Sequence, residues 1–165
     1  MQMTQSNKFN FKGQNLYVGI DVHKKSWSVA ILSENSVLKK FSQAPDPQLL
    51  HDFLTRNYPE GNYYSVYEAG FCGFWIHEEL TKLGISNIVV TPGDVPSIIK
   101  EKLHKTDTVD SNRLARALRS GELNGIYVPT REELENRSLL RARYALVRDL
   151  TREKIVSKDS CIFMA

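Results

Sequence analysis

The sequence predicts an α/β fold, in which a mixed sheet is flanked by helices and followed by a long helical arm. Three observations carry this prediction. Residues 16–21, 26–32 and 36–42 form three consecutive β-rich segments. Later β-rich segments alternate with helical ones, and residues 130–156 contain neither proline nor glycine. Consecutive strands favour an antiparallel meander, alternating strands and helices favour parallel crossovers, and a long uninterrupted stretch favours a helix.

The strands follow from residues that alternate between two faces. In the first segment Leu16, Val18 and Ile20 point one way, and Asp21 ends the strand on the opposite face. The second segment places Trp27, Val29 and Ile31 on one face. Residues 62–68 are β-rich and end on Glu68, and residues 86–92 form a short apolar strand ended by Pro92.

The helices follow from apolar spacing and from their end signals. Residues 46–57 begin with Asp46 as a cap and Pro47 in the first turn. Residues 72–83 form a second helix that stops at Gly84. A third helix carries Leu114, Ala117 and Leu118 on one stripe. In the arm, Thr130 and Glu133 make a capping box.

This element order, strand-strand-strand-helix-strand-helix-strand-helix, is that of an RNase H-like fold, although other α/β folds can start in the same way. The predicted organisation has four parts: a tail at 1–15, the RNase H-like domain at 16–128, a coiled-coil-like helical arm at 129–157, and an atypical tail at 158–165. The arm has an apolar seam of Leu139, Ala142, Leu146 and Leu150, so a homo-oligomer formed through residues 130–156 is expected.

Two carboxylates lie on the inward stripe of the third helix. Asp110 precedes Leu114 by four residues, and Asp107 precedes Asp110 by three, so all share one face. With Asp21 and Glu68 at strand ends, four acids are expected to converge. Such a set stays ionised when hard cations with oxygen ligands, Mg²⁺ or Mn²⁺, bind it. Two such ions can stabilise the attacking and leaving oxygens of a phosphodiester. Taken singly, each acid is better explained without a site. Asp21 and Glu68 would be solvated turn residues and Asp107 a helix-dipole partner, and Asp110 would pair with Arg113 or Arg116.

Three stretches of the chain resemble one family. LYVGIDVHKKSWSVAIL, YEAGFCGFWIHEELTKLGI and VVTPGDVPSIIKEKLHKTDTVDSNRLARALRSGEL resemble the amino-terminal domain of the IS110 insertion-sequence transposases, relatives of the Piv-type invertases. The resemblance runs from about Leu16 to Arg152. It implies a RuvC-like domain with a DEDD tetrad, formed here by the four acids Asp21, Glu68, Asp107 and Asp110.

The resemblance implies DNA transposition by a metal-dependent recombinase. In this family a serine-bearing domain follows the arm, and some members bind a structured RNA that bridges two DNAs. The chain ends with EKIVSKDSCIFMA instead, so a truncated or isolated copy is expected, and whether it is an active enzyme alone stays open. The chain also departs from the family pattern at Thr108, Ser111 and Phe71.

Basic residues predict a nucleic-acid partner. Residues 113–158 carry 11 basic and 6 acidic side chains, whereas residues 1–112 carry 11 and 12. The candidate contacts to DNA or RNA are Lys24, Lys25, Lys105, Arg113, Arg116, Arg141 and Arg148. The two cysteines form no metal spacing or disulfide framework, and no apolar run reaches the length of a membrane span. A cytoplasmic protein without a membrane partner is therefore expected.

Two other functions are compatible with these residues. A catalytically inactive module would bind DNA or RNA and dimerise through the arm. A stand-alone, resolvase-like nuclease would cut branched DNA unaided. A sugar kinase of the actin-like group is set aside, because His23, Lys24 and Lys25 replace the small phosphate-binding turn that group needs.

Overall fold

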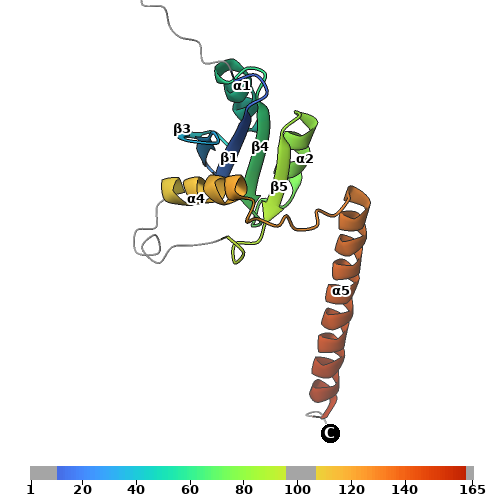
Figure 1. Cartoon of the computed structure of the whole chain (residues 1–165). Helices are drawn as coiled ribbons and strands as arrows, with labels where there is room; N and C mark the ends of the chain where they lie inside the picture. The colour runs from blue at the N-terminus through green and yellow to red at the C-terminus, as the bar shows by residue number, and fades with distance from the viewer. Residues whose placement is uncertain (1–10, 96–106, 163–165) are drawn as a thin grey trace, which may run out of the picture. The chain divides into compact units, whose positions relative to one another are not determined.

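The computed structural model describes residues 11–95 and 107–162, of which 107–109 and 156–162 are described by their backbone alone. The chain divides into two compact units, Met1–Ile126 and Tyr127–Ala165. The first unit holds a five-stranded sheet with its helices, and the second holds one long helix (Figure 1). Within the described residues, none of the helices combines the length and apolar composition that a bilayer crossing requires.

The sheet has the strand order β3-β2-β1-β4-β5. Its strands are β1 (Asn15–Val22), β2 (Trp27–Leu32), β3 (Val37–Gln43), β4 (Asn62–Glu68) and β5 (Ser86–Val90). β1 pairs antiparallel with β2 and parallel with β4, and β5 continues the parallel side. This mixed topology confirms the predicted RNase H-like fold class. β1 lies at the centre, so the residues that end it sit in the middle of the sheet edge (Figure 1).

The described helices of the first unit are α1 (Pro47–Asn57), α2 (Trp75–Lys82) and α4 (Asp107–Ser120). Asp46 caps α1, because its carboxylate accepts a hydrogen bond from the Gln48 amide at 2.8 Å. α2 begins at Trp75, three residues later than predicted, because Gly73 adopts a left-handed conformation with φ of 63° in the preceding turn.

Helices cover both faces of the sheet. Ile20, Val29 and Phe41 stand opposite one another on β1, β2 and β3. The Phe41 ring lies 4.4 Å from that of Phe53 in α1, so α1 covers this face. α4 covers the other face and contacts β1, β2 and β4 (Figure 1). Every residue of β2 is therefore buried, not only the side predicted by alternation.

The buried face of α4 is wider than its predicted stripe. Leu114 and Ala117 are buried as expected, but Ser111, Asn112 and Ala115 are buried too. Ala115 packs against Ala30 and Leu32 of β2, while Leu114 packs against Val66 and Val90. Small residues on this face let the helix lie close to the strands.

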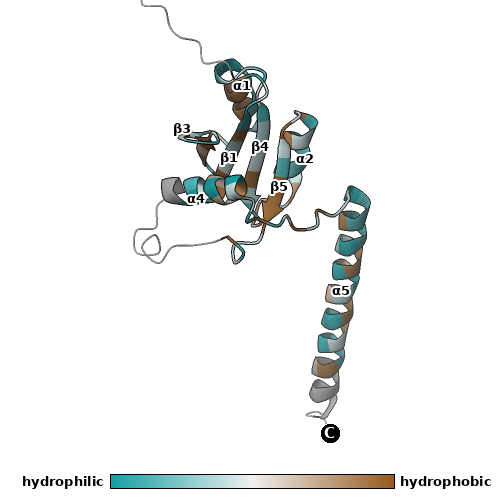
Figure 2. Ribbon diagram, viewed as in Figure 1, coloured by the Kyte–Doolittle hydropathy of each residue, from teal (hydrophilic) through white to brown (hydrophobic). Residues whose placement is uncertain are grey.

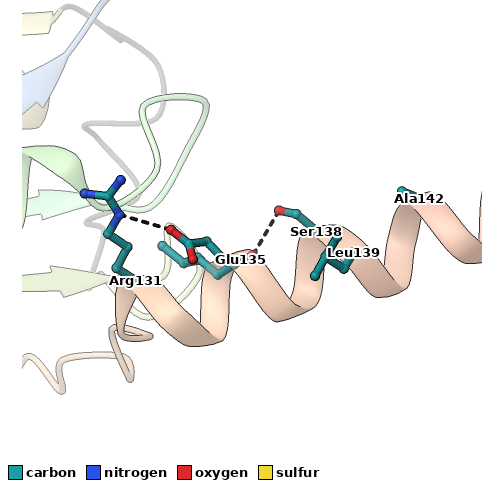
Figure 3. A pocket seen from close by; sticks show the side chains of 6 residues that line it. Arg131, Glu135, Ser138, Leu139 and Ala142 are labelled. Atoms are coloured by element: carbon teal, nitrogen blue, oxygen red, sulfur yellow. Dashed lines mark hydrogen bonds and ion pairs between the residues drawn. The ribbon is translucent and has the colours of Figure 1, made fainter.

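The second unit is dominated by α5 (Arg131–Ile162). The predicted capping box is confirmed: the Thr130 amide donates to Glu133 Oε2 at 2.7 Å, and the Glu133 amide donates to Thr130 Oγ1 at 3.3 Å. The helix continues to Ile162, beyond the predicted arm end at residue 157. Arg131 pairs with Glu135 on the first turns, and Ser138 donates to the Leu134 carbonyl (Figure 3).

Apolar side chains are spaced along α5 (Figure 2). The exposed large apolar side chains of this helix are Leu139, Leu140, Tyr144, Leu146, Val147, Leu150 and Ile155. Each is more than half exposed to solvent within this chain, with Val147 lowest at 52%. A shallow hollow on the helix surface is lined by Leu134, Leu139 and Ala142 together with polar neighbours (Figure 3).

Candidate functional site

The carboxyl ends of β1 and β4 present two acids side by side. Ile20 of β1 pairs with Tyr67 of β4, so Asp21 and Glu68 occupy the next position of each strand. Both project toward the face covered by α4, because side chains alternate and Gly19 and Val66 contact that helix. Their side chains are partly buried, with 22% and 30% of their surface exposed.

Gly19 allows α4 to lie directly on β1. A Cβ atom at this position would stand 2.0 Å from the Ser111 carbonyl oxygen and 2.6 Å from the Ala115 nitrogen. Only a residue without a side chain fits such an approach. The contact places the turn of α4 that contains Asp110 and Arg113 beside the ends of β1 and β4.

Arg113 joins two of the acids. Its Nη2 donates to Glu68 Oε1 at 3.0 Å and lies 3.7 Å from Asp110 Oδ1. The side chains of Arg113 and Asp110 are 20% and 18% exposed, so water screens this group only in part. On the strand side, Asp21 Oδ2 lies 3.2 Å from His23 Nε2.

The electrostatics of Glu68 show that three carboxylates share one neighbourhood. Burial raises the pKa of Glu68 above its usual value, and the charges of Asp110 and Asp21 raise it further. The Arg113 guanidinium opposes this increase without cancelling it. An ionised Glu68 therefore lies in a site that carries more negative charge than Arg113 balances.

The structure thus brings together Asp21, Glu68 and Asp110 of the predicted tetrad. Asp107 is the first residue of α4, but its side chain lies outside the described part of the chain. Among the described side chains, no three acids, histidines or cysteines already form a cluster able to hold a metal ion. A metal site here therefore requires the Asp107 side chain or a rearrangement of the Glu68–Arg113 pair.

The predicted phosphate contacts lie in different places. Lys24 and Lys25 are exposed in the turn after β1, and the Lys24 ammonium lies 5.9 Å from the centre of the Phe71 ring. Arg116 is exposed on α4, whereas Arg113 points to the acids. Lys105 lies outside the described residues.

Two of the predicted contacts, Arg141 and Arg148, lie on the exposed surface of α5 in the second unit. They share that helix with its exposed apolar side chains between Leu139 and Ile155, which form the apolar stripe of α5. This part of the prediction is neither tested nor contradicted by the geometry of the acidic site.

Two exposed aromatic side chains that sequence analysis did not assign to the site follow β4 in the chain. Phe71 is 63% exposed and Trp75 is 45% exposed. Its ring lies 6.2 Å from that of Trp27, which is fully buried, so Trp75 covers the core with one face only. The left-handed Gly73 lies between Phe71 and Trp75, so Phe71 belongs to the turn after β4 and Trp75 is the first residue of α2.

The fold and the acids at its strand ends define the class of protein: an RNase H-like domain with an acidic centre. The DEDD family of IS110 transposases matches residues 18–158 of the chain, under the description "Transposase". The chain belongs to this family.

Relatives of known sequence agree with this assignment. The transposase for insertion sequence element IS1533 of Leptospira borgpetersenii is 34% identical over 146 residues, which covers 86% of this chain and 42% of the relative. The putative transposase y4rJ of Sinorhizobium fredii is 30% identical over 154 residues, covering 83% of this chain and 39% of the relative. The chain thus spans about two fifths of the length of these relatives.

Among solved structures, the chain is similar to RuvC of Thermus thermophilus. The similarity to a complex with a Holliday junction substrate has a TM-score of 0.45 at 13% identity, covering 67% of this chain and 99% of that one. A second structure of the same protein gives a TM-score of 0.46 at 12% identity.

Proposed function

We propose that this chain is the metal-binding catalytic portion of a DNA transposase. The main support for this proposal is that Asp21, Glu68 and Asp110 lie close together. They come from two central strands and from the helix packed across them. Asp107 would complete the tetrad from the first turn of the same helix.

The acids fit the proposed cofactor, Mg²⁺ or Mn²⁺. Their donor set consists of carboxylate oxygens, which these hard cations prefer. The raised pKa of Glu68 also fits: burial is its main cause, the charges of Asp110 and Asp21 add to it, and a bound cation would favour the ionised carboxylate. When bound, such ions supply Lewis-acid stabilisation of the oxygens in a phosphodiester displacement.

The residues of the chain have separate tasks in this proposal. Asp21, Glu68 and Asp110 provide negative ligands at fixed positions, because each belongs to a rigid strand or helix. His23, 3.2 Å from Asp21, orients that carboxylate. Lys24, Lys25 and Arg116 are exposed and would contact the DNA backbone, which is the polyanion this activity requires.

The helix α5 is proposed to join copies of the chain. Its apolar stripe is exposed within the chain, and burial of such a stripe against another helix is the usual source of stability for a long isolated helix. Arg141 and Arg148 on the same helix would add DNA or RNA contacts. A bridging RNA and a serine-bearing partner domain belong to the same proposal.

Calorimetric titration with Mg²⁺ and Mn²⁺ tests the metal site. Wild-type protein is expected to bind, and Asp110→Asn and Asp21→Asn are expected to lose most of this binding. Asp52→Asn is the matched control, because Asp52 is an acid on α1 with 51% of its side chain exposed. If all four proteins respond alike, the tetrad is not a metal site.

Incubation with branched DNA and Mn²⁺ separates the alternatives. Nicking that is lost in Asp110→Asn would support a stand-alone nuclease. Metal-independent DNA binding without any nicking would support an inactive binding and dimerisation module instead.

A further inference from the structure

Arg113 occupies the acidic site in an unusual way for a DNA-contacting side chain. Its side chain is one-fifth exposed, and its Nη2 atom lies 3.0 Å from Glu68 Oε1 and 3.7 Å from Asp110 Oδ1. By comparison, Arg116, three residues along the same helix, is exposed. Arg113 therefore offsets part of the charge of the acids and is largely shielded from solvent.

The guanidinium is only partly satisfied in this position. Its Nε atom is buried, and the described residues offer it no hydrogen-bond partner. An arginine that is locked structurally uses more of its five N–H donors. Arg113 thus binds Glu68 through Nη2, while its buried Nε donor has no hydrogen-bond partner among the described residues. That unpaired donor costs free energy, so moving Arg113 away from Glu68 costs less than breaking a fully paired arginine.

A divalent cation and Arg113 would compete for the same negatively charged carboxylate, that of Glu68. Glu68 Oε1 already accepts the Arg113 hydrogen bond, and the same carboxylate is a proposed metal ligand. Positive charges a few ångströms apart in a partly buried site repel one another strongly. A cation held by Glu68 and Asp110 would therefore repel the guanidinium from its present position.

We propose that Arg113 is a built-in counter-cation that holds Glu68 and Asp110 together in the metal-free protein and releases Glu68 when a divalent ion binds. The inference rests on the proposed metal site. It makes Arg113 a positioning residue, which keeps the acidic site assembled until metal arrives and sets how tightly metal is bound.

The test compares wild type with Arg113→Gln, Arg113→Lys and Lys39→Gln, by thermal unfolding in EDTA and by calorimetric titration with Mn²⁺. In EDTA, Arg113→Gln is expected to unfold at a lower temperature than wild type, since the acids lose their cation. With saturating Mn²⁺ this difference closes. The Kd for Mn²⁺ falls roughly three- to tenfold in Arg113→Gln, because no guanidinium has to be displaced.

The other variants keep the test interpretable. Arg113→Lys retains the positive charge and the fold, so its Kd for Mn²⁺ should stay near that of wild type. Lys39→Gln removes an exposed charge on the edge strand β3 and should match wild type in both measurements. In a Glu68→Gln background, Arg113→Gln should lower the unfolding temperature in EDTA less than it does alone.

The outcomes distinguish this inference from the proposed function. If Mn²⁺ binds wild type and Arg113→Gln with equal affinity, or binds the variant more weakly, the displacement is wrong and the metal site stands. An unchanged unfolding temperature of Arg113→Gln in EDTA would overturn the counter-cation role. If neither wild type nor any variant binds Mn²⁺, both the displacement and the proposed metal function fail.

Discussion

At the residue scale, Gly19 controls how the acids meet. The Ser111 carbonyl and the Ala115 amide of α4 lie where a side chain would begin, and both are backbone atoms that cannot rotate away. The position of Asp110 relative to Asp21 and Glu68 therefore depends on one missing methyl group.

Gly19→Ala is expected to destabilise the protein by about 3 kcal/mol or more, because α4 must move off the sheet. Chemical denaturation measures the effect. Gly93→Ala is the control, since a Cβ there meets nothing within 4 Å and should change stability little. A wild-type midpoint for Gly19→Ala would contradict the close packing of α4 on β1.

A second residue-scale prediction concerns a polar network inside the first unit. Asn87 Nδ2 donates to Ser65 Oγ at 2.8 Å, and Asn87 Oδ1 lies 2.8 Å from His77 Nδ1. Ser65 is fully buried and Asn87 is 7% exposed. Asn87→Ala leaves the Ser65 hydroxyl without this donor, so a loss of about 1–3 kcal/mol is expected in denaturant unfolding. Ser65→Ala combined with Asn87→Ala should cost less than the sum of the two single changes.

At the element scale, the first turn of α5 depends on an ionised Glu133. Its carboxylate accepts hydrogen bonds from the Tyr127 hydroxyl at 2.6 Å and the Thr130 amide at 2.7 Å. The Tyr127 hydrogen bond, and then that of the Thr130 amide, hold the pKa of Glu133 below its ordinary value of 4.5. This stabilisation is complete above pH 4.5 and is lost as the pH falls through the lowered pKa of the folded state.

Hydrogen exchange of the amides at 131–135 measures this cap. We expect faster exchange, relative to the rest of the helix, as the carboxylate protonates, and the same change at neutral pH in Glu133→Ala. Glu153→Ala, on an exposed part of the same helix, should leave these amides unaffected. Protection that is independent of pH and of Glu133 would show that the capping box does not hold the helix start.

The apolar stripe of α5 gives another prediction at this scale. Leu146→Asp is expected to shift the protein toward monomer in sedimentation experiments, because it places a charge in the proposed helix contact. The unfolding temperature of the first unit should not change, since Leu146 is 65% exposed within the chain. Glu153→Gln on the same helix is the control, and an unchanged mass for Leu146→Asp would argue against this contact.

At the scale of the whole molecule, the chain consists of two units that are built differently. The first unit ends at Ile126, whose amide donates to the Val89 carbonyl at 2.7 Å and so adds to the edge of β5. Leu123 packs partly against the core cluster that contains Leu114. The last contacts of the sheet unit, those of Leu123 and Ile126, are therefore present in a chain that ends at residue 126.

A fragment of residues 1–126 is expected to fold alone and to unfold cooperatively within about 3 °C of the first unit in the full chain. A fragment of residues 1–121 lacks the Leu123 and Ile126 contacts and should unfold at a lower temperature. Circular dichroism of both fragments checks this. If the longer fragment is unfolded, the second unit is required for stability of the sheet.

The sequence by itself determined the elements and was enough to predict the acids of the proposed site. Alternation placed Leu16, Val18 and Ile20 in the core, where all are fully buried, and Asp46 and Glu133 were readable as caps because capping acts within four residues. The order of strands and helices determined the RNase H-like class. These features depend on neighbours in the chain, so local spacing is sufficient to find them.

The tertiary structure decided what those residues face. Arg113 was expected to contact DNA, yet its guanidinium lies against Glu68, 45 residues away in the chain. Likewise, Gly19 matters only because α4 crosses it, and the burial of Trp75 on one side depends on its contact with Trp27, 48 residues earlier in the chain. Contacts between distant segments are set by how the elements pack. So is the burial that shifts the pKa of a side chain such as Glu68. No local pattern contains that information, because the same spacing is compatible with many partners.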